Sequence, residues 1–597
     1  MKISAAITQF VGTDGNLALP PTLSVPALSE LILSMSGDAS SDGSREARPV
    51  LRNHDFSTSR EGVVEELTAA EINARVKALA VRLGQVAQPG DCAAILAENS
   101  PAYLIGFLGA MYAGLIPVPL YDPNEPGHSG HLAAVMADCE PAVILTNRHS
   151  ARAVRALQSD RPQAERTRVI AVDAVPAALA RDYQPVPVGL DSPAFMQYTS
   201  GSTRTPAGVI ITHRSMLANV IQILMAAKIK EPARVVLWLP LHHDMGIILA
   251  VMCLAVGFEL DLMTPQAFIQ EPTRWLTQLD RRADDENVYT VLPNFAFELA
   301  ARYGQPAEGL DLSAVDCIIN GSEPVTISTV NQFVDTFAPF GLRRETIRPS
   351  YGLAEATLLV TTPQTENRPY TVYFDREKLA DGQAVTVSSP DNAVTATAVG
   401  EVVRPQWLVV VDPDTHDELP DGQVGELFIH GSNVAGGYYQ RPDDTAETFV
   451  NRLGTPGHRA AGAPDDDAWL ATGDLGAFVD GQLFITGRRK DLIVIAGRNH
   501  YPADIESTVA EATDQVSAVA AFAVPGEDVE KLIILAERAT DVTADDATII
   551  ETITGAVSAA HGVQPADVRL FHPGEIIRSS SGKIARKLNQ KNYIAGK

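Results

Sequence analysis

Short apolar runs alternate with longer stretches of helical spacing over the first 350 residues of the chain. The runs are residues 92–96, 142–145, 169–172 and 235–238. Each run has the length of a buried strand, and the stretches between them are long enough for helices. The alternation predicts βα units on largely parallel sheets, so the expected fold class is α/β.

Two helices are predicted from specific signals. Residues 67–84 place apolar side chains at helical spacing, with Thr68 as the expected cap and Gly84 at the end. Residues 245–258 form the most apolar window, but this window is shorter than the ~20 residues that a membrane helix needs. We expect a buried core helix there and no stable insertion into a membrane.

The pattern changes further along the chain, which suggests more than one domain. Residues 370–430 are rich in Val and Thr and predict a mainly antiparallel β subdomain, and mixed α and β patterns begin near residue 491. A chain of 597 residues also exceeds the size at which one core keeps growing. We expect a large N-terminal domain, residues 1–489, and a small α+β domain, residues 490–597. The polar, Gly- and Ser-rich residues 36–45 predict a mobile loop.

Composition and charge exclude some classes of function. The chain has 47 basic and 73 acidic residues, a net charge of −26, which argues against binding nucleic acid or an anionic membrane. A local basic patch, which an acidic carrier protein would need, remains compatible with this balance. Four widely spaced cysteines and a start without an apolar leader predict buried thiols in a reducing cytoplasm. The cysteines are Cys92, Cys139, Cys253 and Cys317.

Six short motifs follow one another along the chain in a fixed order. They are Tyr198-Thr-Ser-Gly-Ser-Thr203, Pro240-Leu-His-His-Asp-Met-Gly246, Asn320-Gly-Ser-Glu-Pro324, Ser350-Tyr-Gly-Leu-Ala-Glu355, Thr472-Gly-Asp474 with Gly487-Arg-Arg-Lys-Asp491, and Ser581-Gly-Lys583. Together they resemble the signature set of adenylate-forming enzymes, which activate a carboxylic acid with ATP. The resemblance runs from about residue 60 to the end and favours the fatty acyl-AMP ligase branch.

The first motif has the composition of a phosphate-binding loop. Hydroxyl and glycine residues after an apolar run can surround phosphate oxygens with amides and hydroxyls, although the P-loop pattern is absent. The resemblance implies that the nucleotide phosphates are bound by Thr199, Ser200, Gly201, Ser202 and Thr203, and Thr199 is a second candidate metal ligand. Many relatives have lysine where this chain has Ala207, and Arg204 is a candidate for the missing charge.

The resemblance assigns the rest of the nucleotide to four further segments. The residues implied are Asn320, Gly321, Ser322 and Glu323 at the adenine, Ser350, Tyr351 and Gly352 against the same ring, and Asp474 with Arg488 at the ribose. Glu355 is implied to hold Mg²⁺, which suits an ion that takes few carboxylates and offsets charge on pyrophosphate. Taken alone, Glu323 fits a solvated loop acid equally well.

Lys583 is implied to be the catalytic cation. In relatives this lysine swings into the cleft with a mobile small domain and bridges the carboxylate of the acid and the α-phosphate. Two anions that must join repel each other, so a positioned cation lowers the barrier. Lys490 aligns with the family hinge, although an exposed linker lysine explains that position equally well.

The His242-His-Asp-Met-Gly246 motif invites two readings. A metal site would need further ligands at suitable spacing, and the sequence offers none, so no zinc is expected. The resemblance instead puts His243, Asp244, Met245 and Gly246 beside the acyl-binding cleft, with His243 also a catalytic candidate. The apolar residues 247–252 and 295–297 are core by default, and some could line an acyl tunnel.

The acceptor of the acyl group is predicted from about 30 extra residues. They lie at about 363–396 and match the insertion that, in the family, distinguishes fatty acyl-AMP ligases from acyl-CoA ligases and packs against the small domain. The resemblance as a whole implies ATP and Mg²⁺ as cofactors and a long-chain fatty acid as substrate, as in enzymes of mycolic-acid-making bacteria. The acyl group would pass to an acyl carrier protein or polyketide synthase carrier domain on another polypeptide. The alternatives are a fatty acyl-CoA ligase, a silent nucleotide-binding regulator and an amino-acid-activating domain.

Overall fold

The computed structural model describes most of the chain. The described ranges are 10–12, 17–35, 48–125, 129–199, 206–283, 286–365, 368–495, 498–526, 530–540, 542–578 and 583–596. The predicted phosphate-loop residues Ser200, Gly201, Ser202 and Thr203, together with Arg204, lie outside these ranges, as do the polar segment 36–45 and Ser581. Thr199 and Lys583 lie inside them.

A seven-stranded, mostly parallel sheet forms the centre of the large domain. Its order is β13-β12-β11-β9-β10-β1-β2, and only the edge strand β2 runs antiparallel to its neighbour. The strands are β1 (Pro49–Asp55), β2 (Val63–Thr68), β9 (Ala233–Leu237), β10 (Glu259–Met263), β11 (Asn287–Leu292), β12 (Val315–Asn320) and β13 (Ile347–Pro349). The strand order reverses at β9, and ligands of α/β sheets collect at the carboxyl ends beside such a reversal.

A second, wholly parallel sheet lies in the same domain. Its order is β4-β3-β5-β6, with β3 (Cys92–Leu96), β4 (Ile116–Leu120), β5 (Val143–Thr146) and β6 (Arg168–Ala171). The helices of the large domain are α2 (Val25–Met35), α3 (Ala69–Gly84), α4 (Pro101–Tyr112), α5 (Ser129–Cys139), α6 (Ala151–Ala156), α7 (His213–Ala226), α8 (Asp244–Val256), α9 (Pro265–Gln270), α10 (Thr273–Leu279), α11 (Asn294–Tyr303), α12 (Ile327–Phe337), α13 (Arg376–Ala380) and α14 (Pro442–Phe449). All four apolar runs predicted as strands are confirmed, and so is the α/β class.

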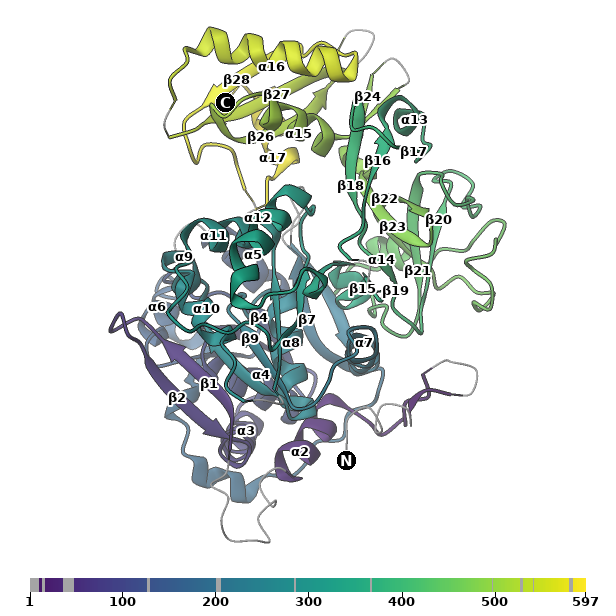
Figure 1. Ribbon diagram of the computed structural model, residues 1–597. Helices are drawn as coiled ribbons and strands as arrows, with labels where there is room; N and C mark the ends of the chain where they lie inside the picture. Colours follow the sequence, from purple (N-terminus) through teal and green to yellow (C-terminus); the bar gives the residue numbers. More distant parts are fainter. Residues whose placement is uncertain are drawn as a thin grey trace.

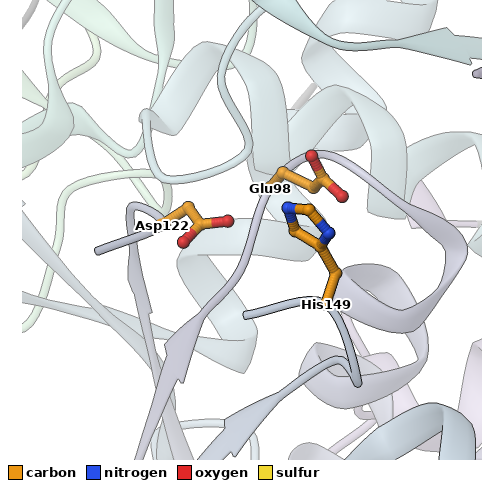
Figure 2. Close-up of side chains that lie close together, drawn as sticks. All are labelled: Glu98, Asp122 and His149. Atoms are coloured by element: carbon orange, nitrogen blue, oxygen red, sulfur yellow. The ribbon is translucent and has the colours of Figure 1, made fainter. Parts of the chain in front are cut away.

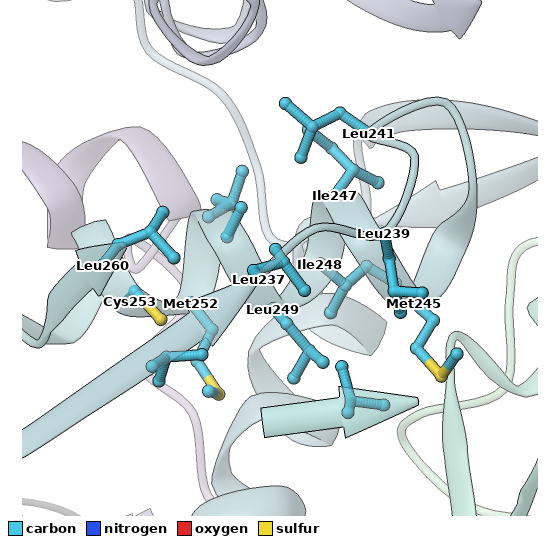
Figure 3. Close-up of a cluster of buried hydrophobic side chains, with 14 of the residues drawn as sticks. Leu237, Leu239, Leu241, Met245, Ile247, Ile248, Leu249, Met252, Cys253 and Leu260 are labelled. Carbon is cyan, nitrogen blue, oxygen red and sulfur yellow. The ribbon is translucent and has the colours of Figure 1, made fainter. Parts of the chain in front are cut away.

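Both predicted helices are confirmed. Thr68 caps α3 in a capping box with Glu71, but the αR cap at the other end is Gln85, so Gly84 is the last helical residue rather than a left-handed cap. Helix α8 is buried along almost its whole length, and Figure 3 shows its apolar side chains packed against the strand end at Leu237 and Leu239. In the part of the chain that the structure describes, no helix combines the length and apolar character of a membrane span.

The antiparallel region is also confirmed. β16 (Thr371–Asp375), β17 (Thr386–Val387) and β18 (Ala393–Thr397) form one small sheet, and β20 (Trp407–Val411), β21 (Gly425–His430), β22 (Leu470–Val479) and β23 (Gln482–Arg488) form another. Two shorter units precede them, the hairpin of β7 (Pro193–Thr199) and β8 (Ala207–Thr212), and the sheet of β14 (Tyr351–Gly352), β15 (Leu359–Thr362) and β19 (Glu401–Val402).

The C-terminal residues form a small α+β unit with its own core. Its elements are β24 (Ile493–Ile495), β25 (Arg498–His500), α15 (Pro502–Ala512), β26 (Val516–Val524), β27 (Lys531–Arg538), α16 (Asp546–His561), β28 (Asp567–Phe571) and α17 (Arg586–Ile594). Ile505, Ile534 and Ile553 are fully buried in that core. Figure 1 shows this unit at one end of the molecule, next to α12, while α2 and α3 lie at the opposite end. The domain boundary at residue 490 stays a prediction.

Candidate functional site

The two ends of the predicted phosphate loop are held by one pair of charged residues. The hydroxyl of Tyr198 donates to Asp138 Oδ2 at 2.6 Å, just before the loop. After the loop, Arg441 Nη2 donates to the carbonyl of Pro206 at 2.9 Å and lies 3.4 Å from Asp138 Oδ1. Thr199 ends β7 between these anchors. The sequence motifs did not identify Asp138 or Arg441, because neither belongs to a recognisable pattern.

The third and fourth motifs meet at the ends of the adjacent strands β12 and β13. Asn320 ends β12, and its carbonyl accepts a 2.8 Å hydrogen bond from the amide of Ser350. The amide group of Asn320 donates to Asn294 at 3.3 Å, while its own buried Oδ1 has no hydrogen-bond partner among the described residues. Gly321 follows directly. Ser322 has a φ of +73°, a conformation that a non-glycine residue rarely adopts outside functional sites.

Glu323 is half-buried. Its Oε1 accepts a 2.6 Å hydrogen bond from the backbone amide of Phe295, in the first turn of α11. Burial raises the pKa of Glu323, and that hydrogen bond and the charge of Lys583 only partly oppose the rise. The carboxylate is thus held by the backbone of α11 and lies within range of the charge of Lys583, and its role at the adenine stays a prediction.

Tyr351, Asp474 and Arg488 come together although the motifs that contain them are far apart in sequence. The hydroxyl of Tyr351 donates to Asp474 Oδ2 at 2.7 Å, and Arg488 Nε lies 3.3 Å from Asp474 Oδ1. Asp474 and Arg488 are direct cross-strand partners on β22 and β23. The charge of Asp474 is the largest cause of the raised pKa of Arg488. Gly352 completes the motif, since a Cβ there would lie 1.7 Å from the carbonyl of Leu358.

Glu355 is half-buried against Tyr438. The Tyr438 hydroxyl donates to Glu355 Oε1 at 2.8 Å, and the backbone carbonyl of Glu355 accepts from Ala435 at 2.9 Å. Burial raises the pKa of Glu355, and the hydrogen bond from Tyr438 opposes that rise. Two residues later Thr357 has a φ of +70°, held by a 2.7 Å hydrogen bond from its hydroxyl to the Asn433 carbonyl. A strained backbone in a β-branched residue persists only where the surrounding contacts hold it. The loop that carries Glu355 is therefore firmly held.

The second motif forms the start of α8. His243 is its N-cap, and His243 Nδ1 lies 2.6 Å from Asp244 Oδ1, which also accepts from the amide of Met245 at 2.7 Å. Burial raises the pKa of Asp244, but the charge and hydrogen bond of His243, the Met245 amide and the charge of Lys583 lower it to a net value below the usual range. Gly246 is required, because a Cβ there would lie 2.1 Å from the carbonyl of Pro240.

Lys583 reaches this cleft from the small domain. Asp244, Glu323 and Asp474 lie close enough for their negative charges to favour its ammonium form. Crowding by protein and then the charge of Arg488 nevertheless lower the pKa of Lys583, even though the side chain keeps solvent access. The structure thus brings one cation from the small domain to carboxylates that follow β9 and β12 and to one on β22. Lys490 lies in the exposed turn Arg489–Asp491 between the two domains, and its hinge role stays a prediction.

The predicted insertion contacts the small domain. Arg376 Nη1 lies 2.9 Å from Asp504 Oδ2 on α15 and 3.1 Å from His561 Nε2 at the end of α16. The hydroxyl of Tyr501 donates to the carbonyl of Leu379 at 3.3 Å. Burial raises the pKa of Asp504 to about 6, an effect that Arg376 opposes. The sequence indicated the insertion but not this ion pair.

A separate cluster of metal-binding side chain types lies outside the cleft. Glu98, Asp122 and His149 follow the carboxyl ends of β3, β4 and β5, with ligand atoms within 4.8 Å of one another (Figure 2). Both carboxylate oxygens of Asp122 already accept hydrogen bonds, from Ser150 at 2.5 Å and from the amide of Asn124 at 2.9 Å. None of the six motifs contributes to this cluster, so we assign it no ligand.

Comparison with known proteins agrees with the geometry of the cleft. The profile described as "AMP-binding enzyme" matches residues 46–439. The long-chain-fatty-acid–AMP ligase FadD32 of Mycolicibacterium smegmatis is 43% identical to this chain. The alignment covers 98% of this chain and 96% of that protein. A protein of Mycobacterium tuberculosis named putative fatty-acid–CoA ligase FadD21 is 40% identical, with 90% of this chain and 94% of that protein covered.

A solved structure shows the same architecture. It is the fatty acyl-adenylate ligase from L. pneumophila in complex with acyl adenylate and pyrophosphate, with a TM-score of 0.71 and 28% sequence identity. The match covers 96% of each chain. The likeness therefore extends over both the large domain and the small one.

Proposed function

Because this chain belongs to the AMP-binding enzyme family, we propose that it is a fatty acyl-AMP ligase. It joins a long-chain fatty acid to the AMP part of ATP and releases pyrophosphate. The observation that carries the proposal is that Lys583 lies within range of the charges of Asp244, Glu323 and Asp474, which belong to three separate motifs. A nucleotide-binding regulator without catalysis would have no need of a cation delivered from a second domain.

In the proposed reaction a carboxylate oxygen of the fatty acid attacks the α-phosphorus of ATP. A new oxygen–phosphorus bond forms, the bond from the α-phosphorus to the oxygen bridging to the β-phosphate breaks, and pyrophosphate leaves with that electron pair. Lys583 supplies a positive charge between the two anions. Unit charges ~4 Å apart interact by about 4 kcal/mol at a surface-like dielectric, which is enough for a large rate effect.

We assign the nucleotide to the residues at the ends of β12 and β13 and on β22 and β23. Asp474 accepts the ribose hydroxyls, with Tyr351 and Arg488 orienting its carboxylate through the contacts at 2.7 and 3.3 Å. Asn320, Gly321, Ser322 and Glu323 line the adenine together with Ser350 and Gly352. The unpartnered Oδ1 of Asn320 is an acceptor suited to an exocyclic amino group.

Glu355 fits the requirements of a magnesium ligand. Its carboxylate is the acid of the nucleotide motif, and burial raises its pKa, a rise that the charge of a bound cation would oppose. Thr199 at the end of β7 offers a hydroxyl beside the phosphate loop. When bound with ATP, Mg²⁺ would supply charge neutralisation on the pyrophosphate.

The second motif fits the acyl end of the site. His243 and Asp244 lie at the N-terminus of α8, followed by Met245 and Gly246 and then by a run of buried apolar side chains. The fatty carboxylate would sit near His243 and Lys583, with the chain entering the apolar interior. Helix α8 excludes water from this end of the cleft, which strengthens the electrostatic interactions there.

We propose a carrier-bound phosphopantetheine thiol as the acyl acceptor, supplied in trans by an acyl carrier protein or polyketide synthase. Support comes from the insertion, whose Arg376 joins Asp504 of the small domain. A contact of this kind opposes the rotation that thioester formation with CoA requires. The four described cysteines are free and buried, in keeping with a cytoplasmic role in lipid biosynthesis.

A fatty acyl-CoA ligase is the second candidate, favoured by the name of the FadD21 relative. Mass spectrometry tests both, on purified enzyme incubated with ATP, Mg²⁺ and a library of fatty acids, alone and with either CoA or a holo acyl carrier protein added. Accumulation of acyl-AMP, with acyl transfer to a holo carrier protein but not to CoA, is the expected result. Acyl-CoA as the main product would establish the alternative, and failure to form any adenylate would refute both.

A further inference from the structure

The charge of this chain is unevenly distributed. Residues 567–597 contain seven Lys and Arg against two Asp and Glu, whereas the other 566 residues contain 40 against 71. The last segment is therefore positive on a strongly negative protein. It includes β28, Lys583 and the final helix α17 (Arg586–Ile594), which Figure 1 shows in the small domain.

Most cations of this segment are already engaged. Arg569 pairs with Asp567 at 2.9 Å, Arg578 lies 3.8 Å from Glu537, and Arg586 donates to Glu506 at 2.8 Å. Lys583 belongs to the cleft. Lys587 and Lys591 differ, since neither forms an ion pair with any residue in the described ranges. Their charge is available to a partner.

Helix α17 has an anchored inner face and a more exposed outer face, on which Lys587 is half-buried and Lys591 exposed. Inside, Asn589 is 4% exposed and exchanges hydrogen bonds with the backbone of Ile577 at 3.0 and 2.9 Å. Tyr593 packs on Phe522 and donates to Asp567 at 2.8 Å. These contacts fix the helix to the small domain. A partner that bound its outer face would therefore contact a rigid surface.

The outer face combines the two lysines with two exposed apolar side chains. Lys587, Lys591 and Ile594 are spaced four and three residues apart, and Leu588 lies three residues before Lys591, so all four project to one side. Leu588 is 39% and Ile594 61% exposed. Exposed apolar groups flanked by unpaired charges of one sign are typical of a recognition surface.

We propose that this outer face of α17 is the docking surface for an acidic acyl carrier domain. The inference rests on the carrier acceptor proposed above and names where that partner binds. Charge complementarity selects the partner, because a small acidic domain would interact favourably with the charges of Lys587 and Lys591. Such a domain can bind through a contact no longer than α17 itself. Lys583 precedes α17 by only three residues, so a docked carrier sits beside the element that enters the cleft.

Other polyanions fit this face less well. Nucleic acid and anionic membranes present extended negative surfaces that would also meet the remaining, strongly acidic protein. Two lysines do not offset that repulsion. A compact partner that touches α17 alone avoids it.

The test is a double charge reversal, Lys587→Glu with Lys591→Glu, in the full-length enzyme. The matched control is Arg152→Glu with Arg155→Glu on α6, two exposed cations on another helix with the same change of charge. Acyl loading of a holo acyl carrier protein and carrier-free pyrophosphate release are measured for both. We expect the α17 variant to raise KM for the carrier at least ~10-fold, with the difference shrinking as salt rises, while pyrophosphate release stays unchanged.

The outcomes separate the two proposals. Equal kcat/KM for the carrier in the wild type, the α17 variant and the control overturns docking on α17 while leaving the carrier acceptor in place. Loading of CoA but not of the carrier by the wild type refutes the acceptor and the docking together. Rescue of the α17 variant by Lys substitutions at acidic positions of the carrier helix would establish the contact directly.

Discussion

The hydroxyl of Tyr351 donates a 2.7 Å hydrogen bond to Oδ2 of Asp474, across 123 residues of sequence. This contact joins the fourth and fifth motifs, one on β14 and one on β22. The other oxygen of the carboxylate lies 3.3 Å from Arg488 Nε. Two neighbours therefore fix the orientation of Asp474 before any ribose is present, which is the preorganisation that nucleotide binding needs.

Asp474→Asn should weaken ATP binding. The variant keeps the shape of the side chain but loses the charge that accepts both ribose hydroxyls and pairs with Arg488. We expect KM for ATP to rise on the order of 10-fold or more, since hydrogen bonds to charged groups contribute about 1.5–3 kcal/mol. Asp480→Asn in the β22–β23 turn is the matched control, because its φ of +49° suits asparagine. Equal effects of the two variants would contradict the assignment.

Tyr438→Phe should change the pH dependence of the reaction. The Tyr438 hydroxyl stabilises the ionised form of Glu355, whose pKa is already raised by burial. Without it the pKa rises further, so the acidic limb of the pyrophosphate-release profile should move upward by about one pH unit. Tyr439→Phe serves as control. An unchanged limb in Tyr438→Phe would show that ionised Glu355 does not limit the reaction.

Arg376→Ala should loosen the contact between the insertion and the small domain. Removing the guanidinium leaves Asp504 buried without its partner, which costs about 3–5 kcal/mol in such pairs. We expect faster hydrogen exchange in α15 and a rise in acyl-CoA formation, with adenylate formation changed less than ~3-fold. Lys378→Ala on the same helix is exposed and should do neither. Unchanged hydrogen exchange in α15 of Arg376→Ala would show that the Arg376–Asp504 ion pair does not hold the insertion to the small domain.

Asp504 should make stability depend on pH. Its folded pKa of about 6 exceeds the ordinary 3.8, so its contribution to the free energy of unfolding is fully present below about pH 4 and is lost as the pH rises through 6. Asp504→Asn removes this pH-dependent contribution to the free energy of unfolding. Between pH 5 and 7.5 the wild type should therefore lose about 1 kcal/mol relative to the variant in denaturant unfolding. Parallel pH profiles would contradict the raised pKa.

Local sequence patterns predicted the helices and strands of this fold, because the secondary structure of a segment depends largely on the residues of that segment. The alternation of apolar runs predicted β3, β5, β6 and β9, and Thr68 predicted the start of α3. Gly84 likewise predicted the end of α3, which is at that residue, although the αR cap that follows is Gln85. The terminal glycine indicated where the helix ends and not the conformation of its cap.

The supporting contacts of the site could not be predicted in this way. Arg441 and Asp138 are 303 residues apart, Tyr438 and Glu355 are 83 apart, and Arg376 and Asp504 are 128 apart. No periodicity links such pairs, since the fold alone brings them together. The motifs identified the groups that would touch substrate, and only the structure identified the residues that orient those groups.

Lys583→Ala tests whether Lys583 supplies the cation of adenylate formation. ATP binding and pyrophosphate release are measured on the same preparation, with Lys587→Ala as control. We expect ATP binding within ~3-fold of the wild type and pyrophosphate release lowered at least ~100-fold, the scale of losing one preorganised donor. Pyrophosphate release near the wild-type rate in Lys583→Ala would contradict this role.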